Sequence, residues 1–190
     1  MKKKKIRKRL EKAVKTRQPC RITMEYKEEP FRYIPLKMSD KLLLSAQDSD
    51  FQFDGYSIRR MEDIEKVKLE DDFVANITIK EMNAEGMESP DIDISDWETA
   101  FTALQKSGKI TIVEKENADR EDCIFAIGII EKVGQKGVFL RYFGPDGIWD
   151  KKQWKIPYDE ITSVTVGSRY AETYARYLPE MPEPEKEPEK

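Results

Sequence analysis

Short stretches of alternating apolar and polar residues recur along most of the chain, and this period of two is typical of β-strands. The pattern predicts two sets of short strands separated by a polar stretch. The first set covers 22–26, 31–36, 42–44, 56–61, 64–69 and 73–80, and the second covers 110–114, 123–133, 138–143, 148–156 and 161–166.

A helical period precedes each set of strands. In residues 3–17 a narrow apolar stripe of Ile6, Leu10, Ala13 and Val14 predicts a helix that Pro19 ends. In residues 95–108 the apolar positions are Trp97, Ala100, Phe101 and Leu104, which lie on one face of a helix.

Capping residues mark the limits of the second helix. Ser95 with Glu98 three residues later forms a capping-box pattern, and Gly108 suits the C-terminal end. A third helix is predicted at 168–178, with Tyr170, Tyr174 and Tyr177 on one face.

Three short motifs occur twice, which indicates an internal duplication. Residues 21–25 resemble 109–114, Asp54-Gly55 resembles Asp146-Gly147, and 63–67 resemble 160–164. We therefore expect two small domains: 1–81 with the first helix and strand set, a linker at 82–94, and 95–178 with the second set. The Pro/Glu/Lys-rich tail 179–190 is expected to be disordered.

The net charge of −3 conceals a strong asymmetry. Residues 1–17 hold ten basic residues and one acidic residue, a charge of +9, and the tail 179–190 carries −3, so the body carries −9. A basic arm on an acidic body can attract nucleic acid or anionic lipid, while the body repels both.

The compartment is inferred from cysteines and from hydropathy. Cys20 and Cys123 lack a CxxC spacing, which predicts reduced, buried thiols rather than a disulfide. No apolar run is long enough to span a membrane, and the lysine-rich start is not followed by the apolar core of a secretory signal. These features favour a cytoplasmic protein.

The order of elements, one helix followed by about five short bent strands in each copy, resembles the Sm-like small barrel, a relative of the SH3-like barrels. The resemblance implies a mainly β fold with flanking helices (α+β), built as two tandem barrels each preceded by a helix. It covers about residues 5–70 and 95–166. The whole resembles an uncharacterised bacterial tandem-barrel protein.

The RNA-reading motifs of that family are not carried over to this chain. Sm proteins that bind uridine-rich RNA use an Asp…Asn signature after the second strand and an Arg-Gly pair between the last two strands. Here the corresponding loops read Met38-Ser39-Asp40 and Gly134-Gln135-Lys136, and the last connections read Arg60-Met61-Glu62 and Ile156-Pro157-Tyr158. The Lys-His pair of bacterial relatives has no counterpart, because the chain contains no histidine.

No motif in the sequence indicates catalysis. Without histidine, the commonest general base and metal ligand is missing. Asp48, Asp50 and Asp54 lie close together but lack the ligand spacing of a calcium loop, so we interpret them as a solvated acidic turn. The glycines form no phosphate-binding pattern. We expect a non-enzymatic protein without cofactor or metal.

The basic arm is the candidate binding segment, with two alternative interpretations. In one, the helix caps its barrel with its apolar stripe, its cations face water, and the protein is an adaptor that binds another protein. In the other, the arm holds phosphates and barrel aromatics stack on the bases of RNA or another nucleic acid. An arm that lies on the body favours the adaptor, and a projecting arm favours nucleic acid. The candidate residues are Lys2, Lys3, Lys4, Lys5, Arg7, Lys8 and Arg9.

Overall fold

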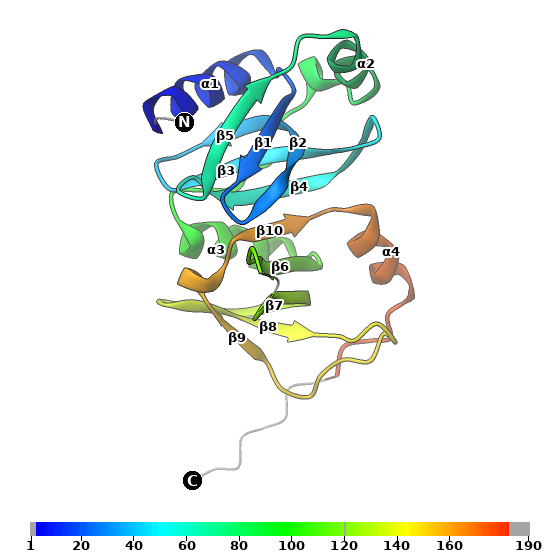
Figure 1. Cartoon of the computed structure of the whole chain (residues 1–190). Coiled ribbons are helices and arrows are strands. Elements are labelled where there is room, and N and C mark those ends of the chain that lie inside the picture. The colour runs from blue at the N-terminus through cyan, green and yellow to red at the C-terminus, as the bar shows by residue number, and fades with distance from the viewer. Residues whose placement is uncertain (1–2, 120, 183–190) are drawn as a thin grey trace.

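The computed structural model of the protein describes residues 3–119 and 121–182, and these form a mixed α+β fold around one antiparallel sheet (Figure 1). The first part of the chain contains α1 (Lys3–Thr16), β1 (Cys20–Met24), β2 (Lys27–Met38), β3 (Leu42–Ser49), β4 (Gln52–Arg60), β5 (Ile64–Leu69), α2 (Phe73–Glu81) and the 3-10 turn η1 (Ala84–Gly86). The second part contains α3 (Trp97–Ser107), β6 (Thr111–Lys115), β7 (Ile124–Gly134), β8 (Gly137–Tyr142), β9 (Trp154–Pro157), the 3-10 turn η2 (Tyr158–Glu160), β10 (Ser163–Val166) and α4 (Arg169–Tyr177).

The ten strands lie in the order β5-β1-β2-β3-β4-β10-β6-β7-β8-β9. The N-terminal half (α1 to β5) and the C-terminal half (α3 to β10) therefore repeat one strand order, in which the last strand in sequence pairs with the first. The halves join where β4 pairs antiparallel with β10, at the middle of Figure 1. The structure thus has one open, continuous sheet. The sheet is not closed into a barrel, so the expectation of two barrels joined by a linker stays a prediction.

The pairing registers show which residues of the two halves are equivalent. Ile22 pairs with Val67 in the first half, and Val113 pairs with Val164 in the second. Val67 and Val164 are 97 positions apart, as the repeated motifs indicate, and Ile22 and Val113 are 91 apart. The resemblance of 21–25 to 109–114, which places Ile22 opposite Ile110, is therefore wrong by three residues.

The two Asp-Gly pairs do not occupy equivalent turns. Gly55 lies inside β4 with a φ of 83°, where its missing side chain leaves room for the backbone of residues 166–168. Gly147 lies in the long connection between β8 and β9, where its amide donates to the carbonyl of Gly144. Asp and Gly are common in turns of several kinds, so a repeated Asp-Gly pair is weak evidence that two turns are equivalent.

The helices α1 and α3 confirm the predictions from the helical period. The offset of 91 also relates Ile6, Leu10 and Ala13 of α1 to Trp97, Phe101 and Leu104 of α3, and all six side chains are buried. The N-cap of α3 is Asp96 rather than Ser95: Asp96 accepts from the amide of Thr99, and the Thr99 hydroxyl accepts from the amide of Asp96.

The strand predicted at 73–80 is wrong, because this segment forms helix α2. Asp72 caps its first turn by accepting a hydrogen bond from the amide of Ala75, and Thr78 anchors it through Asp48 at 3.2 Å. The alternating apolar residues that suggested a strand are only partly used, since Phe73 is 78% exposed. Capping and one buried polar contact outweigh the β propensity of this short segment.

The predictions for the cysteines and for α4 are confirmed only in part. Cys20 is buried as expected, but Cys123 is exposed, because it lies just before β7 rather than inside the strand. Helix α4 begins after its N-cap Ser168, close to the predicted position. Of its tyrosines, Tyr174 packs against Phe143, whereas Tyr177 is 81% exposed.

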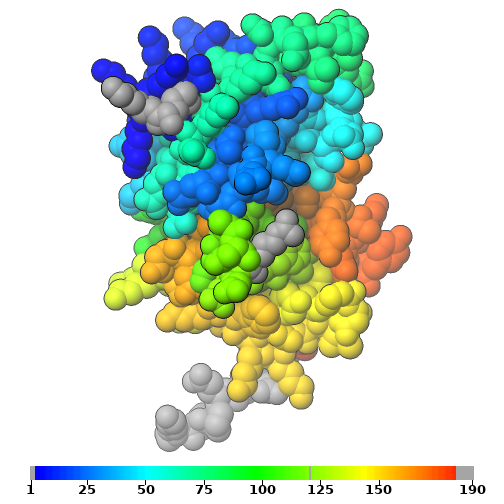
Figure 2. Space-filling view, in the orientation of Figure 1, coloured from blue at the N-terminus to red at the C-terminus, as the bar shows by residue number. Residues whose placement is uncertain are grey.

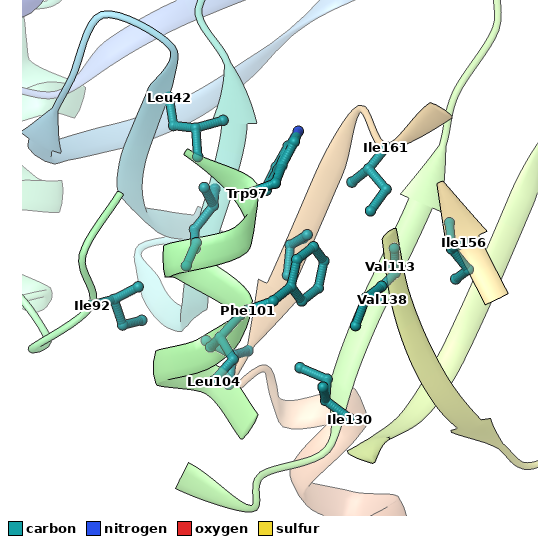
Figure 3. Packing of buried hydrophobic residues seen from close by; sticks show 14 of the residues in the cluster. Leu42, Ile92, Trp97, Phe101, Leu104, Val113, Ile130, Val138, Ile156 and Ile161 are labelled. Carbon is teal, nitrogen blue, oxygen red and sulfur yellow. The ribbon is translucent and has the colours of Figure 1, made fainter. Parts of the chain in front are cut away.

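The largest hydrophobic core lies between the two halves (Figure 3). Helix α3 contributes its buried face, with Phe101 pointing toward the strands of the C-terminal half. The N-terminal half contributes Leu42, Leu44 and Ile58 to the same core. Ile92, from the stretch interpreted as a linker, is also buried there. The two halves therefore share a core that neither completes alone.

Replacement of Trp97 by alanine tests this shared core. Trp97 is 8% exposed and packs on Phe101 at 5.8 Å between ring centroids. We expect Trp97→Ala to lower the free energy of unfolding by about 3–5 kcal/mol, since it leaves a cavity in the main core. Urea denaturation measures the loss. Trp154→Ala, at a 40% exposed side chain, serves as the control and should cost clearly less.

Candidate interaction surfaces

Helix α1, which carries the candidate basic residues, lies on the body of the protein. It covers β2 and β5 at the end of the N-terminal half, seen at the top of Figure 1. Its stripe of Ile6, Leu10 and Ala13 joins a core with Ile22 and Val67. The apolar stripe thus holds the helix along its length, and the described part of the arm does not project.

Three arginines of α1 and its C-terminal end are engaged within the fold. Arg7 Nη1 lies 2.7 Å from Asp40 Oδ1, and this hydrogen bond raises the pKa of the Arg7 guanidinium. Arg9 Nη1 donates to the carbonyl of Val67 in β5 at 2.5 Å. Arg17 Nη1 donates to the carbonyl of Leu36, at the bulge in β2, at 2.9 Å. These cations satisfy carboxylate and backbone acceptors of the body.

The described lysines of α1 are exposed to solvent. Of the candidate residues, Lys3, Lys4, Lys5 and Lys8 are exposed, and Lys2 lies outside the described residues. Lys12 and Lys15 continue this exposed surface along the helix. The structure therefore divides the candidate set: the arginines contact the fold, while the described lysines form a solvent-facing basic strip.

A polar network centred on Arg59 bridges the two halves. Arg59, 5% exposed, donates from Nε to the Tyr33 hydroxyl at 2.8 Å, and from Nη1 to the Tyr26 hydroxyl at 3.0 Å and to Glu116 Oε2 at 2.5 Å. The Phe31 ring lies 3.9 Å from the guanidinium carbon. Because Glu116 belongs to the C-terminal half, this ion pair links the halves beside the β4–β10 ladder.

The aromatics proposed to stack on nucleic-acid bases are largely occupied. Tyr26, Phe31 and Tyr33 contact Arg59, and burial raises the pKa of the Tyr26 hydroxyl. In the C-terminal half Tyr142 stacks on Trp154 at 4.4 Å between ring centroids, and Trp154 is 40% exposed. Stacking on a base would require these pairs to separate or to use their outer faces.

Glu114 lies next to the Arg59 network, and the fold shifts the pKa of its carboxyl group. Burial, and next the negative charge of Glu116, raise the pKa of the Glu114 carboxyl. The Ser163 hydroxyl donates to Glu114 Oε2 at 3.0 Å and partly offsets this effect. The fold therefore favours the protonated form of Glu114.

Two clefts open at the waist between the halves. One, of about 600 Å³, is lined by residues that include Leu42, Arg60, Trp97 and Tyr158. The other, of about 730 Å³, lies between the β1–β2 hairpin and the segment after β6, which are neighbours in Figure 2 (blue and bright green). Its lining includes Glu25, Glu28, Glu29 and Cys123. The waist is thus acidic, whereas α1 is basic.

The acidic loop interpreted as a solvated turn is partly buried. The Asp48 carboxylate is 1% exposed and pairs with Arg32 at 3.0 Å, which corrects the expectation for this residue. Asp54 accepts a hydrogen bond from the amide of Arg169 at 2.7 Å. Within residues 3–119 and 121–182, no three acidic or cysteine side chains gather to hold a metal ion.

None of the helices in the described part of the chain is long and apolar enough to cross a membrane. No protein-family model, no curated protein and no solved structure matches this chain.

The residues of the waist were not identified from the sequence. Arg59 follows Ile58 in a strand pattern, and the alternation does show that its side chain faces the opposite side of the sheet from the buried Ile58. Its partners Tyr33 and Glu116 are 26 and 57 positions away, and only the fold brings them together. The β period gives no signal for this burial, because it assigns Arg59 to the face opposite the buried Ile58.

Removal of the Arg59 guanidinium should destabilise the protein. Arg59→Met leaves Glu116 and two phenol hydroxyls without their donor, and we expect a loss of about 3 kcal/mol in the free energy of unfolding, measured by urea denaturation. The double variant Arg59→Met/Glu116→Gln should recover part of this loss, since it also removes the stranded charge. An equal loss in both variants would contradict the ion-pair explanation.

Glu114→Gln should stabilise the protein near neutral pH. The folded-state pKa of Glu114 lies above its ordinary value of 4.5, so stability is fully present below that value and is lost as pH rises through the folded pKa. Glutamine cannot ionise and still accepts from Ser163. The melting temperature of the variant should exceed that of the parent at neutral pH, and the difference should vanish near pH 4.5; a constant difference would refute the titration of this group.

Proposed function

We propose that this chain is a non-enzymatic interaction module, an adaptor that binds another protein in the cytoplasm. In this proposal the halves are two small barrels of the Sm-like/SH3-like kind within 1–81 and 95–178, with 82–94 between them and 179–190 as a tail. The shared strand order of the halves and the helix before each of them support this finer assignment.

The docked position of α1 is the observation that carries the adaptor proposal. The arm lies on the acidic body, held by its buried stripe and by arginine contacts to Asp40 and to the carbonyls of Val67 and Leu36. A cation paired within the fold contributes little to the attraction of phosphates. Screening limits the remaining attraction to about 8 Å at physiological salt, a distance at which acidic groups of the body also act.

Nucleic-acid binding remains the second candidate, because the exposed lysines of α1 form a continuous strip. Lys4, Lys8 and Lys12 follow one another at a spacing of four, which places them on one face of the helix. Contacts to phosphates from such a strip carry no base specificity. Binding of this kind would be indifferent to sequence and strongly dependent on salt.

A salt titration separates the two functions. Labelled single- and double-stranded oligonucleotides are titrated with the intact protein and with the variant Lys4→Gln/Lys8→Gln/Lys12→Gln. The adaptor predicts no measurable binding near about 150 mM salt for either protein. The alternative predicts binding that weakens steeply with salt, with a slope that falls by about one for each phosphate contact removed in the variant.

Recovery of a partner from cell lysate, with and without nuclease, completes the test. An adaptor should recover the same protein in both preparations. Oligonucleotide binding at physiological salt, or a partner that is lost after nuclease treatment, would overturn the adaptor proposal in favour of nucleic acid.

A further inference from the structure

One helix position has a charged residue in the N-terminal half and a small apolar residue in the C-terminal half, and each residue suits its own surroundings. By the offset of 91, Arg9 of α1 is equivalent to Ala100 of α3. Ala100 is fully buried in the shared core, together with Val164 of β10 and Ile58 of β4. The small side chain of Ala100 thus lies where β4 of the N-terminal half packs beside β10 of the C-terminal half.

The backbone edge beside this position is also equivalent in the two halves. In β5 the amide of Glu70 donates toward β1, to the carbonyl of Pro19, so alternation directs the backbone groups of Val67 and Leu69 away from β1. In β10 the equivalent Val164 meets Ile58 of β4. One edge of β10 pairs with β4. The equivalent edge of β5 lies at the end of the sheet.

Arg9 takes the place of that strand. Its Nη1 donates to the carbonyl of Val67, the residue whose counterpart Val164 pairs with β4. One outward position is thus satisfied by a strand in one half and by a guanidinium in the other. An unpaired edge invites strand addition, and charged side chains at an edge are a known protection.

We propose that the outer edge of β5 is a strand-docking site for a partner protein, and that Arg9 is the latch that closes it. The inference rests on the proposed adaptor function and names the surface through which it acts. The partner donates an extended segment that pairs antiparallel with β5 and places an apolar side chain beside α1. This is the chemistry of β4, in which Ile58 packs on α3 and β10.

The edge strand β9 of a second copy does not supply this segment. The strand equivalent to β4 is β9, and the offset of 97 places Lys155 where β4 has Ile58. The amide of Tyr158 donates to Lys136 in β8, so alternation directs Pro157 outward, and proline has no N–H to offer. A lysine and a missing donor make β9 a poor match for the β5 edge, and self-assembly through β9 is not expected.

The experiment uses a labelled peptide with the sequence of β4, Gln52–Arg60, as the probe. It is titrated into the intact protein and into Arg9→Ala, with binding followed by fluorescence anisotropy. We expect Arg9→Ala to bind at least about tenfold more tightly than the parent. The same peptide with Ile58→Lys should bind neither protein. Backbone hydrogen exchange at Val67 and Leu69 should slow in Arg9→Ala when the first peptide is added.

Arg17→Ala is the matched control, because Arg17 also donates to a backbone carbonyl but not at the outer edge of β5. It should bind the peptide like the parent. Should Arg9→Ala fail to fold, Arg9→Met keeps the alkyl stem and removes only the donor. Equal binding by the parent and the Arg9 variants would overturn the latch, and no binding by a folded Arg9 variant would overturn the docking site.

These outcomes are independent of the test of the adaptor proposal. Oligonucleotide binding would refute the adaptor while the peptide result still reports on the β5 edge. Failure of the peptide to bind would leave the adaptor with other surfaces, such as the clefts at the waist. Concentration-dependent self-association of Arg9→Ala without peptide would show that a second copy of the chain is the occupant and would overturn the assignment to a partner protein.

Discussion

The antiparallel ladder between β4 and β10 is the interaction on which the rest of the structure depends. A five-stranded unit of this size buries only about 60% of the surface of its unfolded chain, which leaves little margin of stability. The ladder removes two sheet edges at once and brings Leu42, Leu44 and Ile58 against α3. The result is a core that belongs to both halves, so we expect the halves to unfold together.

Duplication of an element does not duplicate its surroundings, and the equivalent positions record the difference. The position of Arg59 in β4 corresponds to Ile156 in β9, since Met61 and Tyr158 two residues later make the same contact to the preceding strand. At the junction, Arg59 reaches Glu116 of the other half, whereas Ile156 lies in the hydrophobic core. Arg9 and Ala100 differ in the same way. In both pairs the N-terminal half has an arginine at a position whose neighbours differ from those of the equivalent position in the C-terminal half.

The sequence predicts the local elements well where one period dominates. The stripes of α1 and α3 are regular over three turns, and both helices form as predicted. The strand predicted for the segment of α2 is wrong because few of its alternating apolar positions are buried. The deciding contact, Thr78 to Asp48, joins residues 30 positions apart. The repeat was recognised, but its register was not, since short apolar motifs match at several offsets and only the strand pairing selects one.

The candidate site illustrates the same limit for function. The seven candidate basic residues of the arm are conspicuous in the sequence, yet composition treats Arg7, Arg9 and Lys8 alike. In the fold, Lys8 faces solvent, Arg7 holds Asp40, and Arg9 crosses to the edge of β5. Guanidinium groups suit this task because their several donors can satisfy backbone carbonyls, whereas a lysine presents a compact and strongly hydrated charge. The division between arginine and lysine therefore separates the part of the arm that builds the protein from the part available to other molecules.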